Sequence, residues 1–340
     1  MGKVFDELID SIVATTQDYK DGTVMDTDHV KAWIEQFEED KQETILKEMD
    51  HILKKYYVSK KQAANFLETL LDKKEIVGDF SSNYNAIEFL DIQQKGNSQS
   101  DLLELMEEVM DEHFDIALTD CGTNPTTYIY LDDCMFSGNT VYRDIEKWAS
   151  KRDIQNTTIH LVFLSLYKGN IKYVTNKLNS IFEGKNVEIE FWAIHWLVNN
   201  AWDNSHYDCL WPTQMQDDDE YVTSFSEYIE ELREKSGKSN PFALFRPISY
   251  PNKEKLFTSK QGRIVVEQEF LKKGAYLFTF RKKDTIKPMG YSYFNDMGFG
   301  SMFITYRNIA NNCPLVLWWG DRSQWYPLDQ WHPLFPRTVN

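Results

Sequence analysis

The sequence predicts an α/β protein with a parallel, doubly wound sheet, preceded by a helical portion and followed by an aromatic α+β extension. From about residue 85, segments with strand character alternate with loops and amphipathic helical segments. Residues 158–166, TIHLVFLSL, form an almost continuous apolar run, as expected for a strand covered on both faces. We therefore expect three parts: a helical portion over residues 1–80, the α/β core over 81–200, and a C-terminal extension over 201–340 packed on the core.

The helical portion is predicted from apolar residues that recur with the period of an α-helix in three consecutive segments. A capping-box pattern at Ser59–Gln62 marks the start of the third segment. The apolar positions are Val30, Trp33, Ile34 and Phe37; then Ile45, Met49, Ile52, Leu53 and Tyr56; then Ala63, Phe66, Leu67 and Leu70. Nothing in these helices indicates chemistry.

The core is predicted to contain four strands, over residues 86–92, 127–133, 158–166 and 187–197. Helices with a buried apolar stripe are expected to follow the first three strands, the first of them from near Asp101. A sheet of this kind binds ligands at the carboxyl ends of its strands. A ligand site is therefore expected at the strand ends.

Composition narrows the classes of function. The formal net charge of −16 disfavours binding of nucleic acid or acidic membranes by the surface as a whole, so an anionic ligand needs a local cationic site or a metal. The four cysteines are scattered and form no CxxC pair, which fits a reducing cytoplasm. No apolar run approaches the roughly 20 residues that span a bilayer. We expect a soluble cytoplasmic protein that makes no use of a membrane.

One stretch, YIYLDDCMFSGNT at residues 128–140, combines the features of a ligand site. The apolar strand is expected to end at Asp132 and Asp133, which places two carboxylates at the ligand-binding edge of the sheet. Residues 137–140 then offer hydroxyls, a glycine and successive backbone N–H groups at a helix start, which suit phosphate. Beside a phosphate, the carboxylates would accept hydrogen bonds from sugar hydroxyls or hold Mg²⁺. The pattern predicts a phosphorylated sugar as the ligand.

At these residues the sequence resembles the type I phosphoribosyltransferase family. The PRPP motif of that family runs from four hydrophobic residues through two acids to small hydroxyl residues around a glycine. Tyr130, Cys134 and Phe136 depart from it, and Phe136 would narrow a phosphate pocket if its ring pointed into the loop. The resemblance implies a phosphoribosyltransferase-like sheet, binding of PRPP and dependence on Mg²⁺.

The same resemblance implies a pyrophosphate loop earlier in the sheet, for which residues 94–98, QKGNS, are the candidate. Gly96 would let the backbone approach the ligand and Lys95 would supply positive charge. A plain helix cap with a solvated lysine is the alternative. The expected site residues are Asp132 and Asp133 for catalysis and metal binding, and Lys95, Gly96, Ser98, Ser137, Gly138, Asn139, Thr140 and Arg307 for ligand binding.

A broader resemblance covers most of the chain. The sequence is similar to phosphoribosyltransferase-like proteins with a C-terminal extension, found in bacterial conflict systems that include retron-linked anti-phage loci. This resemblance implies a toxin-like effector acting on nucleotides or nucleic-acid bases. The implied partners are a protein or nucleic acid of a defence system, such as a reverse transcriptase with its DNA and RNA, or an ATPase.

The implied reaction is glycosyl transfer through an oxocarbenium-like transition state, with the protein positioning PRPP and Mg²⁺ and stabilising the departing pyrophosphate. Two alternatives stay open. One is a non-catalytic nucleotide-binding sensor or effector subunit, and the other is an N-glycosidase that uses the same cradle without PRPP.

The extension is rich in large aromatic residues near its end. Trp318, Trp319, Trp325, Tyr326 and Trp331 would either stack on bases or pack as the core of the extension, and core packing is the preferred interpretation. We expect the extension to cover the strand ends as a lid, with Arg307 as the residue that reaches the ligand.

Overall fold

The computed structural model describes residues 2–237, 242–281, 286–290 and 296–337. The chain forms two compact units. One unit combines Met1–Ser59 with Val198–Val339, and the other contains Lys60–Leu197. Each unit is described by itself below.

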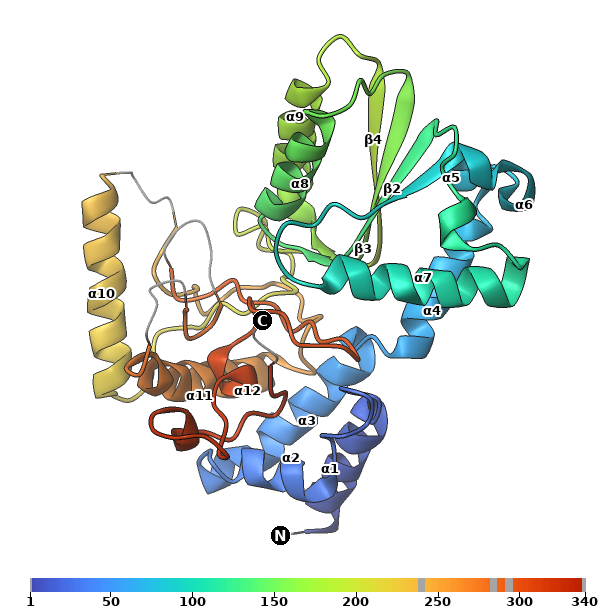
Figure 1. Ribbon diagram of the computed structural model, residues 1–340. Helices are drawn as coiled ribbons and strands as arrows, with labels where there is room; N and C mark the ends of the chain where they lie inside the picture. The colour runs from blue at the N-terminus through green and yellow to red at the C-terminus, as the bar shows by residue number, and fades with distance from the viewer. Residues whose placement is uncertain (1, 238–241, 282–285, 291–295, 338–340) are drawn as a thin grey trace. The chain divides into compact units, whose positions relative to one another are not determined.

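The unit of Lys60–Leu197 is built around a parallel sheet of four strands (Figure 1). The strands lie in the order β1-β2-β3-β4, and every neighbouring pair is parallel. Their bounds are Ile87–Leu90 for β1, Thr127–Met135 for β2, Thr157–Tyr167 for β3 and Val187–Leu197 for β4. The α/β class and the parallel sheet expected from the alternating pattern are confirmed.

Helices cover both faces of this sheet. The helices α8 (Asn139–Ala149) and α9 (Ile171–Ile181) share one hydrophobic core with Tyr128 and Tyr130 of β2. The helix α7 (Ser98–Phe114) packs against β2 but contributes no residue to that core. Because successive side chains of a strand point to opposite faces, the buried Ile129 and Leu131 lie on the side of α7. The sheet is therefore doubly wound.

Short helices precede the sheet in the same unit. They are α4 (Lys60–Leu71), which packs against α7, followed by α5 (Lys74–Val77) and α6 (Phe80–Asn83). Single 3₁₀ turns lie at Tyr84–Ala86, Leu118–Asp120 and Lys168–Asn170.

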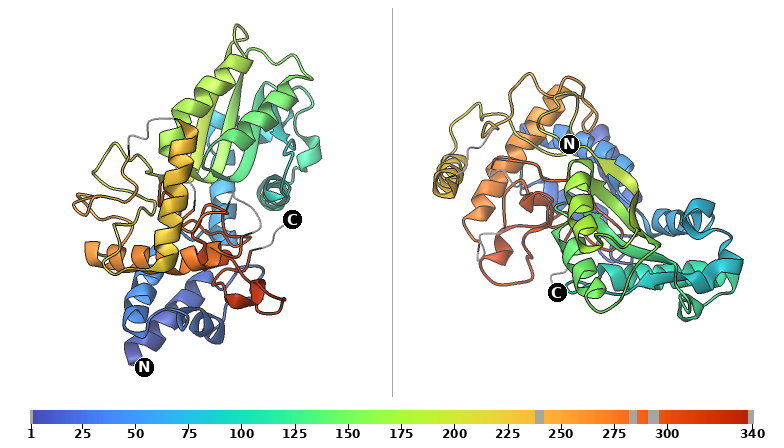
Figure 2. Two further views of the ribbon diagram at one scale, coloured as in Figure 1. Left: turned by 90° about the vertical axis from the view of Figure 1, so that its left-hand side faces the viewer. Right: turned by 90° about the horizontal axis from the view of Figure 1, so that it is seen from above.

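The other unit joins the two ends of the chain. Its helices are α1 (Lys3–Thr16), α2 (Thr27–Ile34), α3 (Glu39–Tyr56), α10 (Glu220–Ser236), α11 (Lys260–Phe278) and the short α12 (Leu315–Trp318), with a 3₁₀ turn at Leu328–Gln330. In the described part of the extension, backbone pairing outside these helices takes the form of isolated bridges such as Leu210 with Gly300. Figure 2 shows α10, α11 and the first helices from two further sides.

The first three helices share a core with the extension, which the sequence did not indicate. The indole of Trp33 in α2 donates a hydrogen bond to the Val316 carbonyl at 2.9 Å, and the Tyr19 hydroxyl donates to the Pro336 carbonyl at 3.0 Å. Glu48 in α3 accepts a hydrogen bond from the Thr258 backbone N–H at 2.7 Å, just before α11 begins. The contacts thus divide the chain after residues 59 and 197, whereas we expected a separate helical portion over residues 1–80 and an extension packed on the core.

A buried ion-pair network organises the extension. Glu267 in α11 accepts hydrogen bonds from Arg246 at 2.8 Å and from Arg263 at 2.9 Å, and Arg263 also pairs with Glu254 at 2.7 Å. The Glu267 side chain is 0% exposed. Four groups that are costly to bury are thereby paired with one another.

In the described residues, no helix is both long and apolar enough to cross a bilayer.

Candidate functional site

The candidate site begins where β1 ends and β2 continues. The last paired residue of β1 is Leu90, opposite Tyr130. Strand β2 runs on beside β3 as far as Met135, which pairs with Leu166. The expectation that β2 ends at Asp132 and Asp133 is therefore corrected, because their neighbour β3 continues to supply backbone partners. Both aspartates instead lie on a strand that has lost its neighbour β1, at the carboxyl edge where doubly wound sheets bind ligands.

Asp132 is the buried centre of this edge, with 5% of its surface exposed. Its carboxylate accepts hydrogen bonds from the Ser98 hydroxyl at 2.5 Å and from the Asp133 backbone N–H at 2.8 Å. Burial, and next the repulsion from the Asp133 carboxylate, raise the pKa of Asp132 to about 8. A carboxyl group with so high a pKa beside a half-exposed one is typical of a functional site.

The loop that follows β1, residues 91–97, is held at its base by Gln99. The Gln99 side-chain oxygen accepts hydrogen bonds from the backbone N–H groups of Ile92 at 2.5 Å and Gln93 at 2.8 Å, and its nitrogen donates to the Leu131 carbonyl at 3.1 Å. Gln93 in turn donates to the Ser98 hydroxyl at 2.8 Å. The first loop is thus fixed to β2 and to the serine that holds Asp132.

The tip of the first loop is open to solvent. Lys95 and Gly96 are both exposed. Gly96 has a φ of +90°, a conformation that side-chain-bearing residues rarely adopt. The lysine and the backbone of the loop tip are therefore accessible, and their contact with a ligand stays a prediction.

Asp144 in α8 connects the first loop to β2, and sequence reasoning missed it. Its carboxylate accepts hydrogen bonds from the Gln94 backbone N–H at 3.2 Å and from the Tyr130 hydroxyl at 3.0 Å. Burial raises its pKa, and the hydrogen bonds from Tyr130 and Gln94 partly oppose that rise. The signal in the sequence was an acidic residue within the apolar stripe of Val141 and Ile145, just as Gln99 is a polar residue in the buried stripe of α7.

The second loop, residues 136–138, leads from β2 into α8 and requires a glycine. Gly138 has a φ of +75°, and a Cβ atom there would lie 2.0 Å from Cγ2 of Val174. The Asn139 backbone N–H donates to the Ser137 hydroxyl at 3.3 Å, and Asn139 and Thr140 are exposed at the start of α8. Hydroxyls and helix N–H groups are therefore gathered here, as the motif indicated.

Phe136 does not narrow this loop. Its ring is buried against Tyr167 at the end of β3, with 4.9 Å between the ring centroids. The bulk that departs from the motif is therefore used for packing beside β3.

A comparison with protein-family models agrees with this fold. The model of the family PRTase-CE, a phosphoribosyltransferase-like family with a C-terminal extension, matches residues 30–337. The chain belongs to the PRTase-CE family. The match takes in both loops, β2 and the extension. No curated protein and no solved structure matches the chain.

In this PRTase-CE chain the structure joins Ser98, Asp132 and Asp133 by hydrogen bonds, and Ser137 with Asn139 at the start of α8. Ser98 and Asp132 touch although they are 34 positions apart. Arg307 is half-buried in the unit that contains Val198–Val339, so its predicted contact with the ligand, and the lid, stay predictions. Within the described residues, no three His, Cys, Asp or Glu side chains cluster as a preformed metal site.

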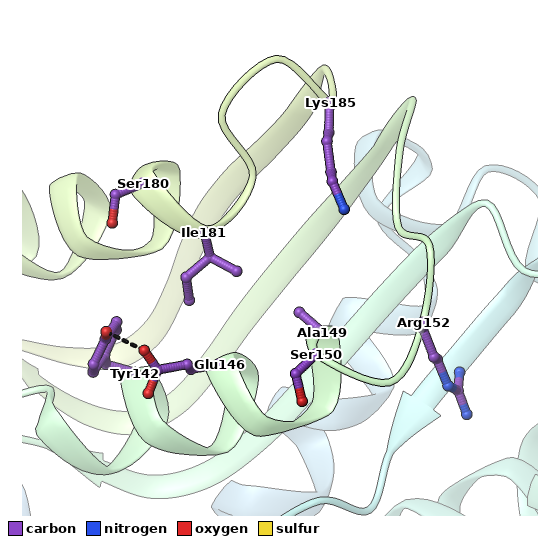
Figure 3. Close-up of a pocket in the computed structure, with 8 residues that line it drawn as sticks. All are labelled: Tyr142, Glu146, Ala149, Ser150, Arg152, Ser180, Ile181 and Lys185. Atoms are coloured by element: carbon purple, nitrogen blue, oxygen red, sulfur yellow. Dashed lines mark hydrogen bonds between the residues drawn. The ribbon is translucent and has the colours of Figure 1, made fainter.

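A surface pocket of about 510 Å³ lies elsewhere on the same unit of the PRTase-CE chain, between α8 and α9. Figure 3 shows it, with Tyr142 hydrogen-bonded to Glu146 and Arg152 turned away from Lys185. Arg152 is engaged by Glu88, with N–O distances of 2.6 and 2.7 Å. No expected site residue lines this pocket, so we place the candidate site at the carboxyl edge of the sheet.

Proposed function

We propose that this PRTase-CE protein binds PRPP, or another nucleotide that carries a ribose 5-phosphate, at the two loops and transfers the ribosyl phosphate group. The observation that supports this most is the hydrogen bond from Ser98 to Asp132, because it joins the start of α7, directly after the first loop, to the acidic pair of β2. In this proposal the second loop and the start of α8 hold the 5-phosphate, and the first loop with Lys95 holds the pyrophosphate.

Asp132 and Asp133 take the ribose hydroxyls, a bound Mg²⁺, or both. Their fit to Mg²⁺ rests on the donor set, since Mg²⁺ in proteins is usually held by one or two carboxylates together with substrate phosphates. When bound, the ion would neutralise charge that develops on the pyrophosphate. The raised pKa of Asp132 means that the free protein carries a proton there at neutral pH, which it would give up to bind a cation or to accept from two hydroxyls.

The reaction needs positioning more than a protein nucleophile. The bond from C1 of the ribose to a pyrophosphate oxygen breaks, and the electron pair leaves with pyrophosphate. The acceptor supplies the pair that forms the new bond to C1. The protein contributes fixed N–H groups, Lys95 and the exclusion of water.

Titration calorimetry with PRPP, AMP and NAD, with and without Mg²⁺, tests the binding proposal. We expect Mg²⁺-dependent binding that Asp132→Asn with Asp133→Asn abolishes while the far-UV circular dichroism stays unchanged. Asp153→Asn makes the same kind of charge change on an exposed residue of the same unit and should bind as the wild type does. Absence of binding to all three ligands would overturn the assignment of the site.

Turnover separates the enzyme from a sensor. Loss of PRPP and release of pyrophosphate, followed by phosphorus NMR with cell extract as the source of acceptor, should occur with the wild type and stop in the double variant. Tight binding without turnover would favour a sensor. Ribose 5-phosphate and adenine formed from AMP in buffer, without PRPP, would favour an N-glycosidase.

We also propose a role in anti-phage defence, which rests on the resemblance of the whole chain to conflict-system proteins. Phage plating on cells that carry the gene with its genomic neighbours tests it. The wild type should lower plating efficiency, and the Asp132→Asn with Asp133→Asn variant should restore it.

A further inference from the structure

A row of aromatic side chains crosses the surface of the unit that contains the chain ends. We call it the aromatic strip and define it as Tyr221, Tyr276, Phe280, Tyr326 and Trp325. Ring centroids lie 5.3 Å apart for Tyr221 and Tyr276, 5.1 Å for Tyr276 and Phe280, and 5.7 Å for Phe280 and Tyr326. The strip thus joins the start of α10, the end of α11 and the segment 321–330.

The strip is open to solvent, most of all at its end. Trp325 is 88% exposed and Tyr326 is 70% exposed, and the other three rings are half-buried. The neighbouring Trp318, Trp319 and Trp331 are at most 9% exposed. The aromatic cluster seen in the sequence is therefore divided: three tryptophans form the core of the extension, and Trp325 with Tyr326 does not belong to it.

The segment that carries Trp325 is ordered by its own hydrogen bonds. The Asp321 backbone N–H donates to the Leu328 carbonyl at 2.8 Å and closes the loop, and the Gln324 N–H donates to the Asp321 carbonyl at 3.0 Å. The Ser323 hydroxyl donates to the Asp321 carboxylate at 2.6 Å. A backbone that is ordered before binding loses little entropy when a partner arrives, and tryptophan and tyrosine often dominate binding energy at protein interfaces.

Acidic side chains border the strip at both ends. Residues 217–220, DDDE, directly precede Tyr221, while Asp321 and Asp329 flank Trp325. Among the cations that the structure describes near the strip, Lys272 pairs with Glu38 and Arg322 donates a hydrogen bond to Gln36. Together with the net charge of −16, this disfavours nucleic acid, acidic membranes and a second copy of this chain as the occupant.

The same unit shows what such rings bind. The guanidinium of Arg281 lies 3.9 Å from the ring centroid of Phe278 and 5.0 Å from that of Tyr228, and Lys287 lies 5.0 Å from Tyr228. Among the described residues, no cation lies over the rings of the strip. We propose that the aromatic strip docks a basic segment of a partner protein, whose arginine and apolar side chains stack on Trp325 and Tyr326 while its charge faces the acidic borders.

A short labelled peptide of alternating arginine and leucine, titrated by fluorescence anisotropy into the full-length protein, tests this proposal. Trp325→Ala with Tyr326→Ala should weaken its binding at least about tenfold, as expected for the loss of two interface aromatics. Trp202→Ala is the matched control, because Trp202 is a 71% exposed tryptophan of the same unit outside the strip, and it should leave the affinity unchanged. Binding should also weaken as salt is added.

Three results would overturn the proposal. Equal affinity of the double variant and the wild type would show that the peptide binds to the acidic surface at large. Equally tight binding of an aspartate–leucine peptide, or of single-stranded DNA, would contradict the basic character of the partner. Self-association of the wild type that the double variant loses would assign the strip to a second copy of the chain.

Discussion

At the scale of single residues, the site depends on a carboxyl group that the fold makes costly to ionise. The pKa of Asp132 rises from 3.8 to about 8 on folding. A carboxyl group whose pKa is higher in the folded state favours folding at low pH, and this contribution is lost as pH rises from about 4 to about 8. Asp132 therefore destabilises the free protein at pH 8.

Replacing Asp132 by asparagine should remove this penalty. We expect Asp132→Asn to unfold at a higher temperature than the wild type at pH 8, by roughly 2–4 °C for each kcal/mol regained. The difference should shrink as the pH is lowered toward 4. Thermal melts followed by circular dichroism across this range measure it, and a variant that melts below the wild type at pH 8 would show that Asp132 is structural.

Gly138 is the residue of the second loop that tolerates least change. An alanine there has to adopt a positive φ and displace Val174, so we expect Gly138→Ala to cost about 2–5 kcal/mol and to weaken binding of phosphate ligands. Gly184→Ala separates the two effects, because Gly184 has a φ of +76° with nothing within 4 Å of the added Cβ. Urea unfolding of both variants checks this, and equal losses would argue against the clash with Val174.

Lys95 should act on the ligand and not on the fold. As a cation at the pyrophosphate it would contribute charge-assisted hydrogen bonds of about 1.5–3 kcal/mol, so Lys95→Ala should weaken PRPP binding about tenfold or more. The melting temperature of the Lys95→Ala variant should match that of the wild type, since the Lys95 side chain is exposed. Lys151→Ala, an exposed lysine of the same unit, serves as the control. An unchanged affinity for PRPP would favour the alternative interpretation, in which the first loop is a plain helix cap with a solvated lysine.

At the scale of elements, local sequence patterns predicted the features that depend on nearby residues alone, namely the strands and the second loop. The apolar runs located all four strands, and the motif placed the second loop at the start of α8. The end of β2 was wrong by two residues, because two adjacent charges suggest a strand end while pairing with β3 carries the strand through them. Gln99 and Asp144 were missed because each lies in an apolar helical stripe, and only the fold shows that their partners are the backbone of one loop and the hydroxyl of Tyr130.

At the scale of the whole molecule, the sequence did not predict that the two ends of the chain fold together into one unit. Amphipathic periodicity shows that α2 and α3 bury a face, but not that the partner of Trp33 lies 283 residues away. The expected core packing of the aromatic-rich ending holds for Trp318, Trp319 and Trp331, which are buried. The exposure of Trp325 and Tyr326 could not be read from composition, because buried and exposed tryptophans alternate within the same short segment.

Removing one member of the buried ion-pair network should strongly destabilise that unit. Glu267→Ala would leave Arg246 and Arg263 short of a partner in a dry interior, which costs about 3–5 kcal/mol and lowers the melting temperature by roughly 6–20 °C. Glu231→Ala removes an exposed pair with Lys235 and should change stability by less than about 0.5 kcal/mol. Calorimetric melts of the two variants decide the matter. A Glu267→Ala protein as stable as Glu231→Ala would mean that the network is neutral.

Proton release on PRPP binding tests the central claim most directly, that the Asp132 edge of the sheet is where the ligand binds. Titrations with Mg²⁺ at pH 7, in buffers of different ionisation enthalpy, count the protons released per PRPP bound. The wild type should release close to one proton more than Asp132→Asn, because its carboxyl group, with a pKa of about 8, has to ionise on binding. Binding of PRPP with the same proton count and the same affinity in both proteins would place the ligand elsewhere and contradict the account.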